Sequence, residues 1–201
     1  MTRRQGKART AVIIALGAAA LVLCAVWAKN QLAMRSDNKA AEVVVGQALI
    51  ALKRNDAKAL DRLLFTRNAD HYFALHEPET LQLEIDNRRD YWGLQHIPDK
   101  SILRTVKAKR DVSRTLVGKI LQLSAHEKMT GKWRTWSQDT PVLVTYSVRG
   151  VPMMSVALRE NGVWKIDSIP CYMSTKVLRY GSPMDAYVAG DDPARNPYWK
   201  N

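Results

Sequence analysis

The sequence predicts an α+β fold: an N-terminal transmembrane helix, followed by a helical hairpin packed on a curved antiparallel sheet of about four to five strands. Three observations lead to this prediction. Residues 11–28 contain no charged and no strongly polar side chain. Apolar residues then recur at helical spacing between residues 44 and 64, and from residue 142 the spacing changes to the alternation of a β-strand. Helices that precede strands favour a sheet with one face buried against the helices.

Residues 11–28 are expected to cross a membrane as an α-helix, because in lipid every backbone polar group must be satisfied within the segment. At ~1.5 Å per residue the run spans about 27 Å, close to the ~30 Å hydrocarbon core of a bilayer. Four bases and no acid precede the run. The positive-inside rule therefore places residues 1–10 in the cytoplasm and everything after Lys29 outside.

A cleaved signal peptide is the alternative, because small residues such as Ala28 before Lys29, after a basic start and an apolar run, fit that pattern too. The run is longer than the ~7 to 15 residues of a usual signal-peptide core, which favours a retained anchor. Cys24 follows the bulky Leu23, so we interpret it as a residue of the membrane helix and not as a lipidation site. The expected location is the inner (cytoplasmic) membrane, crossed once, with the C-terminal domain exported.

Length and charge indicate one domain with appendages. The chain has 201 residues and a net charge of +12. Residues 1–36 hold six bases and no acid, so the remainder is only moderately basic and its charge does not indicate a nucleic acid partner. Cys171 is the only cysteine beyond the span, which excludes a disulfide within the domain. The expected segments are a basic cytoplasmic segment (1–10), the transmembrane helix (11–28), a linker (29–38), an exported α+β domain (39–178) and an irregular C-terminal tail (179–201).

The exported domain is expected to begin with a helical hairpin. Ser36 or Asp37 would cap a first helix that begins near Lys39. Asn55-Asp56 would end this helix and start a second one, and a short helix is expected over residues 81–94. The residues expected on the buried faces of the hairpin are Val44, Ala48, Ala51 and Leu52, then Ala57, Leu60, Leu63 and Leu64.

The C-terminal half is expected to form an antiparallel meander. Alternating residues predict a half-buried strand over Val142–Val148, and Gly150 turns the chain into a second strand. Asn161-Gly162 predicts a hairpin, because this pair tolerates the positive φ angles of a type I′ turn, and a third strand would cover Val163–Ile169. The alternating apolar residues of the second strand are Met154, Val156 and Leu158. For Ser101–Arg110 a strand is favoured over a helix, and Leu116–Ala125 fits either period, with a strand preferred.

Two short stretches carry a resemblance to a known family. Residues 48–60 (ALIALKRNDAKAL) and 160–167 (ENGVWKID) look like the helix break and the final strand of the cystatin-like cone fold, also called the nuclear-transport-factor-like fold. The resemblance covers roughly residues 39–170 and implies a sheet curved around helices. The layout of a short tail, one span and an exported cone-fold domain also looks like the inner-membrane scaffold subunits of type IV secretion systems, although no motif specific to them is present.

No residue is identified as catalytic, cofactor-binding or metal-ligating. Phosphate-binding glycine loops, hydrolase elbows and zinc-protease motifs are all missing from the sequence. His71 and His76 are five residues apart, a spacing that separates their imidazoles around a helix and argues against a zinc site. Asp86, Asp90 and His96 lie in the unassigned middle of the chain, where an acid–base pair would need a geometry that sequence does not show.

The proposed interaction surface joins bases and aromatic residues. Lys and Arg alternate with Trp around residue 133, a pattern suited to anionic partners, although packing of the Trp rings onto the domain is the simpler interpretation. Aromatic residues in the tail must either fold back or meet a partner. The candidate residues are Lys132, Trp133, Arg134, Trp136, Tyr198 and Trp199.

These patterns favour a non-enzymatic, membrane-anchored periplasmic interaction domain, such as a subunit of an envelope or secretion assembly. The expected partners are the lipid bilayer, through residues 11–28, and a second protein or another copy of the chain; no cofactor and no nucleic acid are expected. One alternative is an exported small-ligand binder or enzyme that uses a cone-fold pocket. Another is a binder of nucleic acid or anionic lipid through Lys132 and Arg134, with steep salt dependence.

Overall fold

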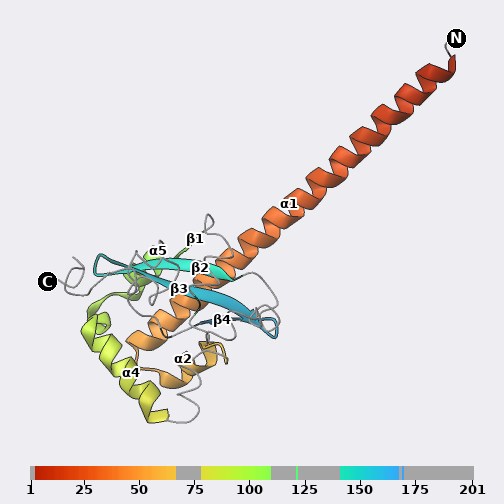
Figure 1. Ribbon diagram of the computed structural model, residues 1–201. Helices are drawn as coiled ribbons and strands as arrows, with labels where there is room; N and C mark the ends of the chain where they lie inside the picture. The colour runs from red at the N-terminus through yellow and green to blue at the C-terminus, as the bar shows by residue number, and fades with distance from the viewer. Residues whose placement is uncertain (1–2, 67–77, 110–120, 122–140, 168, 170–201) are drawn as a thin grey trace, which may run out of the picture. The chain divides into compact units, whose positions relative to one another are not determined.

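The fold is α+β, as predicted (Figure 1). The computed structural model describes residues 3–66, 78–109, 121, 141–167 and 169. The chain divides into two compact units, Met1–Asn38 and Lys39–Asn201. The described elements are α1 (Arg3–Lys53), α2 (Ala57–Leu63), α4 (Pro78–Tyr91), the 3-10 helix η1 (Leu94–His96), α5 (Asp99–Thr105), β1 (Lys107–Lys109), β2 (Val142–Val148), β3 (Val151–Glu160) and β4 (Val163–Ile166).

The predicted start of a helix near Lys39 is wrong, because α1 is one continuous helix from Arg3 to Lys53. Ser36 and Asp37, the expected caps, lie inside it. Residues 29–38 contain no proline and no glycine, and most of them are good helix formers. Extending an existing helix costs far less than nucleating a new one, so a polar composition alone does not interrupt it.

The break between α1 and α2 lies where it was predicted. Asn55 has a φ of 59°, in the left-handed region. The Asp56 amide donates to the Ala51 carbonyl at 2.9 Å and the Asn55 amide donates to Leu52 at 3.2 Å, the paired bonds of a Schellman motif. The Asp56 side chain then accepts a hydrogen bond from the Ala59 amide at 2.9 Å and caps α2.

The predicted apolar faces of both helices are buried. In α1 the face of Val44, Ala48 and Leu52 belongs to the core, as does Ala51. In α2 the face is anchored by Leu60, and Leu64 follows it into the core. The remaining two predicted residues of α2, Ala57 and Leu63, are partly buried against the same core.

The strand predicted over Ser101–Arg110 is wrong for most of its length. Residues 99–105 form α5, and among the described residues of this stretch, which end at Lys109, only Lys107–Lys109 form a strand, β1. Ile102 and Val106 are both buried, at four residues apart, a separation that fits a helix as well as a strand. The helix begins after Pro98 with an acid, Asp99, in its first turn, and both features favour a helix start.

The sheet is an antiparallel meander with the order β1-β2-β3-β4. Tyr146 of β2 lies opposite Met153 of β3, and both hairpin turns carry two residues with positive φ. At the predicted turn these are Asn161 at 50° and Gly162 at 79°, which confirms the type I′ prediction. Pairing continues beyond β4, because the Phe65 amide donates to the Ile166 carbonyl at 2.8 Å.

The main core lies between the sheet and the part of α1 that belongs to the second unit. In Figure 1 the strands cross this part of α1, and α2 and α4 follow beyond its end. The predicted alternation is confirmed, since Val142, Val144, Tyr146 and Val148 are all buried. The prediction of a half-buried strand holds only in part: on the other face Leu143 is 1% exposed, whereas Thr145 and Ser147 are partly exposed. The side chains buried on that face also include Met154, Val156 and Leu158.

Two expected segments lie outside the described residues. Of Leu116–Ala125 only Leu121 is described, and it is fully buried. The expected irregular tail, 179–201, is outside as well. The helix expected over residues 81–94 is present as α4, which begins at Pro78 and ends at Tyr91.

We predict that Leu49→Ala lowers the free energy of unfolding by about 2 to 5 kcal/mol, because Leu49 of α1 is fully buried in the core. The same substitution at Leu83, which is 60% exposed on α4, changes it by no more than about 0.5 kcal/mol. Urea titration of the full chain in mild detergent measures both. Equal losses for the two variants would contradict the core assigned to α1.

Candidate interaction surface

The predicted interaction residues all lie outside the described part of the chain, so their placement is untested. They are Lys132, Trp133, Arg134, Trp136, Tyr198 and Trp199. The histidines of the rejected zinc site, His71 and His76, are also outside. Candidate surfaces are therefore built from the residues that the structure does describe.

The acids and the histidine of the unassigned middle do not form an acid–base pair with one another among the described residues. Asp86 and Asp90 of α4 both lie near Arg89, at 3.9 Å and 3.8 Å. His96 is exposed in η1, and no hydrogen bond joins it to either acid. Within the described ranges no group of three or more His, Cys, Asp or Glu side chains is arranged to hold a metal ion.

The first candidate surface is the apolar part of α1. Its described side chains from Leu16 to Asn30 are all exposed, and the helix is long and apolar enough to cross a membrane. Such length and composition fit a signal anchor and a signal sequence alike. Exposed apolar area costs about 25 cal/mol per Å² in water, so this stretch favours a lipid environment. The large exposed apolar residues are Leu16, Leu21, Val22, Leu23, Val26 and Trp27.

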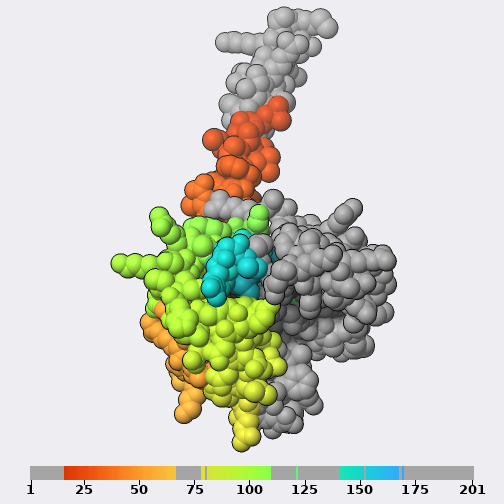
Figure 2. Space-filling model, turned by 90° about the vertical axis from the view of Figure 1, so that its left-hand side faces the viewer, coloured from red at the N-terminus to blue at the C-terminus, as the bar shows by residue number. Residues whose placement is uncertain are grey.

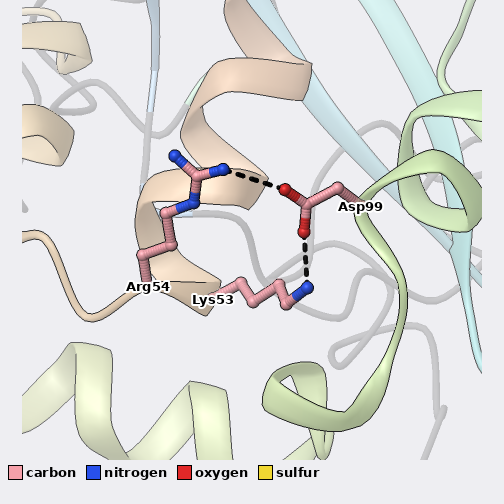
Figure 3. A network of polar contacts seen from close by, with 3 residues as sticks. All are labelled: Lys53, Arg54 and Asp99. Carbon is pink, nitrogen blue, oxygen red and sulfur yellow. Dashed lines mark hydrogen bonds and ion pairs between the residues drawn. The ribbon is translucent and has the colours of Figure 1, made fainter.

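A polar cluster ties the C-terminal end of α1 to the start of α5 (Figure 3). The Asp99 carboxylate accepts hydrogen bonds from Lys53 Nζ and, at 3.0 Å, from Arg54 Nη2. The Lys53 hydrogen bond is the main cause that lowers the pKa of Asp99, and Arg54 acts in the same direction against partial burial. Sequence reasoning missed this cluster, because nothing local links Arg54 to an acid that lies 45 residues later.

A second polar contact fixes α4 and leaves one of its faces outward. Gln82 Nε2 donates to Asn55 Oδ1 at 2.6 Å, so α4 is held at the α1–α2 break. Leu83, Asn87 and Tyr91 are spaced four residues apart and therefore share a face of the helix. Leu83 is 60% exposed and Tyr91 is 84% exposed. Tyr is one of the residue types that dominate the energetics of protein contacts, and Leu83 adds exposed apolar area on the same face.

The interior of the second unit is packed in the region where a ligand pocket was considered. Tyr146 is 3% exposed, and its hydroxyl lies 3.1 Å from Ser155 Oγ, so the polar end of the ring has a partner. Trp164 packs partly against the core, with the Arg159 guanidinium 5.1 Å from its ring centre. Met154 is buried as well, but on the opposite face of the sheet from Tyr146.

Comparison of the chain with protein-family models, with curated proteins and with solved structures found no match. The candidate surfaces therefore rest on geometry and chemistry alone. They are the apolar part of α1, the outward face of α4, and the polar cluster of Lys53, Arg54 and Asp99 at the start of α5.

We predict that Asp99→Asn lowers the urea midpoint of unfolding at pH 7. Because the pKa of Asp99 is lower in the folded chain, its stabilising effect is present above the unfolded-state pKa of about 3.9 and is lost as the pH falls through the folded-state value. Wild type and variant should therefore converge as the pH is lowered from about 4. A difference that persists unchanged at pH 2 would contradict the assignment.

Matched variants separate the two basic partners of Asp99. The Lys53 side chain is 18% exposed and that of Arg54 is 66% exposed, so solvent screens the second ion pair more strongly. In double-mutant cycles with Asp99→Asn, Lys53→Gln should show the larger coupling energy and Arg54→Gln the smaller one.

Proposed function

We propose that the protein is a membrane-anchored, non-enzymatic interaction domain, exported to the periplasm or its equivalent, and a subunit of an envelope or secretion assembly. The observation that carries this proposal is the exposed apolar stretch of α1, preceded by four bases and no acid. The lipid tails remove the apolar side chains from water, and the helix satisfies its own backbone polar groups. The basic start favours a cytoplasmic N-terminus. The location that follows is the inner membrane, crossed once.

We further propose a cystatin-like cone fold for the second unit. Three features support it: the long helix packed against an antiparallel sheet, the left-handed break at Asn55 before α2, and the Asn-Gly hairpin that leads into β4. In such an arrangement the helix occupies the concave side of the sheet. The packed core around Tyr146 supports an interaction role over a ligand pocket.

A partner protein, or another copy of the chain, is proposed to contact the outward face of α4. Tyr91 is the most exposed of the large hydrophobic residues for which exposure is described, and Leu83 extends the same helix face. An isolated exposed leucine is ordinary, but a Leu and a Tyr on one face offer a compact apolar contact. Type IV secretion scaffolds are the class of assembly that the layout suggests.

The anchor is tested by the mass of the mature N-terminus after expression with the native leader, combined with cell fractionation. We expect an intact N-terminus in the membrane fraction, released by detergent and not by salt, because the apolar stretch is held by lipid. Loss of about 28 residues with soluble exported protein would identify a cleaved signal peptide. The small-ligand hypothesis would then replace the scaffold proposal.

The partner contact is tested by photo-crosslinking in intact cells, with Tyr91→p-benzoylphenylalanine as the probe. We expect an adduct of one discrete mass, because a specific partner surface lies against this position. Lys58→p-benzoylphenylalanine is the control, since Lys58 is exposed on a different helix, α2. Monomer only from both positions, or the same adducts from both, would rule out a docking role for α4.

A further inference from the structure

The segment from α5 to β1 carries a strong positive charge, most of which pairs with no carboxylate of the described residues. Its four bases are Lys100, Arg104, Lys107 and Lys109, and all are exposed. None of the four forms an ion pair with a described residue. The single acid of the segment, Asp99, already accepts from Lys53 and Arg54. The segment therefore presents exposed cations that no carboxylate in the described part of the chain neutralises.

The second half of this segment lies beside the first turns of α1 within the second unit. A Cβ placed on Gly46 would lie 2.8 Å from Leu103 Cδ2, so α5 crosses α1 in van der Waals contact at that glycine. Further along, the Ala108 amide donates to Glu42 Oε1 at 3.0 Å. Asp99 contacts the other end of α1, at Lys53. The segment thus runs antiparallel to α1, and its last bases lie near the residue where the second unit begins.

The strand geometry of β1 directs two of these bases outward. Ala108 packs partly against the core, and Lys107 and Lys109 on either side of it are exposed. Lys39 of α1 adds a further base at the same end, with its side chain 76% exposed. The carboxylate of Glu42, 20% exposed, is held between Lys39 at 3.5 Å and the Ala108 amide, so little of its charge reaches solvent.

We propose that Lys39, Arg104, Lys107 and Lys109, here called the basic cluster, bind the phosphate groups of anionic lipids in the membrane that anchors the chain. This inference rests on the anchor of the proposed function. Glu42 follows residue 28, the end of the expected span, by 14 residues, which is at most about 21 Å along a helix at ~1.5 Å per residue. The headgroup layer beyond the hydrocarbon core takes up about 5 to 8 Å of this rise, so the chain tethers the cluster within that limit of the lipid. Anionic headgroups attract bases within a Debye length, about 8 Å at physiological ionic strength. Figure 2 shows the part of the surface, in green, to which α5 and β1 belong.

Lysine labelling of the full chain in nanodiscs tests the proposal. Nanodiscs of phosphatidylcholine alone are compared with nanodiscs that contain phosphatidylglycerol, and a water-soluble amine reagent is followed at each lysine by peptide mass spectrometry. We expect labelling of Lys39, Lys107 and Lys109 to slow about threefold or more with the anionic lipid and to recover in high salt, because the contact is electrostatic. Lys58 on α2, beyond the far end of α1, is the internal control and should not change.

A matched pair of variants tests whether the residues of the basic cluster bind the lipid jointly. Lys107→Gln with Lys109→Gln should remove most of the protection of Lys39, whereas Lys58→Gln should leave it intact. A further arm adds free glycerol phosphate to phosphatidylcholine nanodiscs. Protection by glycerol phosphate equal to that by the anionic lipid would assign the cluster to a soluble phosphate ligand and overturn the lipid proposal.

The outcomes separate this inference from the anchor on which it rests. A chain that stays in the nanodisc but is labelled equally in both lipid compositions keeps its anchor and loses the lipid-binding cluster. A chain that is cleaved and leaves the membrane fraction removes the anchor itself. Protection of Lys58 together with the cluster would indicate general shielding by the lipid surface and would also overturn the proposal.

Discussion

The fold of the second unit depends on the burial of one helix face against one sheet face. Apolar residues of α1 from Ala41 to Leu52 share a core with Val144, Tyr146 and Ile166 of the strands. At about 25 cal/mol per Å² of buried apolar surface, this contact outweighs any single polar interaction in the unit. Two of the shorter helices are positioned directly by α1: α2 by the break at its end, and α5 by the close approach at Gly46.

Polar contacts then determine how the shorter elements attach to this core. Asp99 joins α5 to the end of α1, and Glu42 caps the amide of Ala108 in β1. Thr105 Oγ1 accepts a hydrogen bond from the Ser147 amide at 3.1 Å and so links the end of α5 to β2. Because each contact is partly exposed, it contributes less to the free energy of folding than the core does. Its main effect is to fix the position of the short element relative to the core.

Charge distribution connects this architecture with the proposed role. In the proposed topology the bases before residue 11 favour a cytoplasmic N-terminus, and Lys39 of the basic cluster follows residue 28 by 11 residues. The proposed contact with anionic headgroups would limit the orientations of the anchored second unit. A membrane protein gains affinity for a second partner when its orientation is restricted, because less entropy is lost on binding.

The sequence predicted an element correctly where the residues that decide its structure are neighbours in the chain. The positive φ of Asn161-Gly162, the helix break at Asn55-Asp56, the apolar span and the α+β class could all be predicted from neighbouring residues. The candidate site could not: the partner of Arg54 lies 45 residues away, and the burial of Leu143 depends on what covers the far face of the sheet. Ile102 and Val106 fit helix and strand equally, so their spacing did not decide the structure of α5; the helix start at Pro98 and Asp99 and packing against the core did. Sequence alone therefore determined the elements whose hydrogen bonds and turns close locally, and tertiary structure decided those whose stabilising contacts come from distant segments.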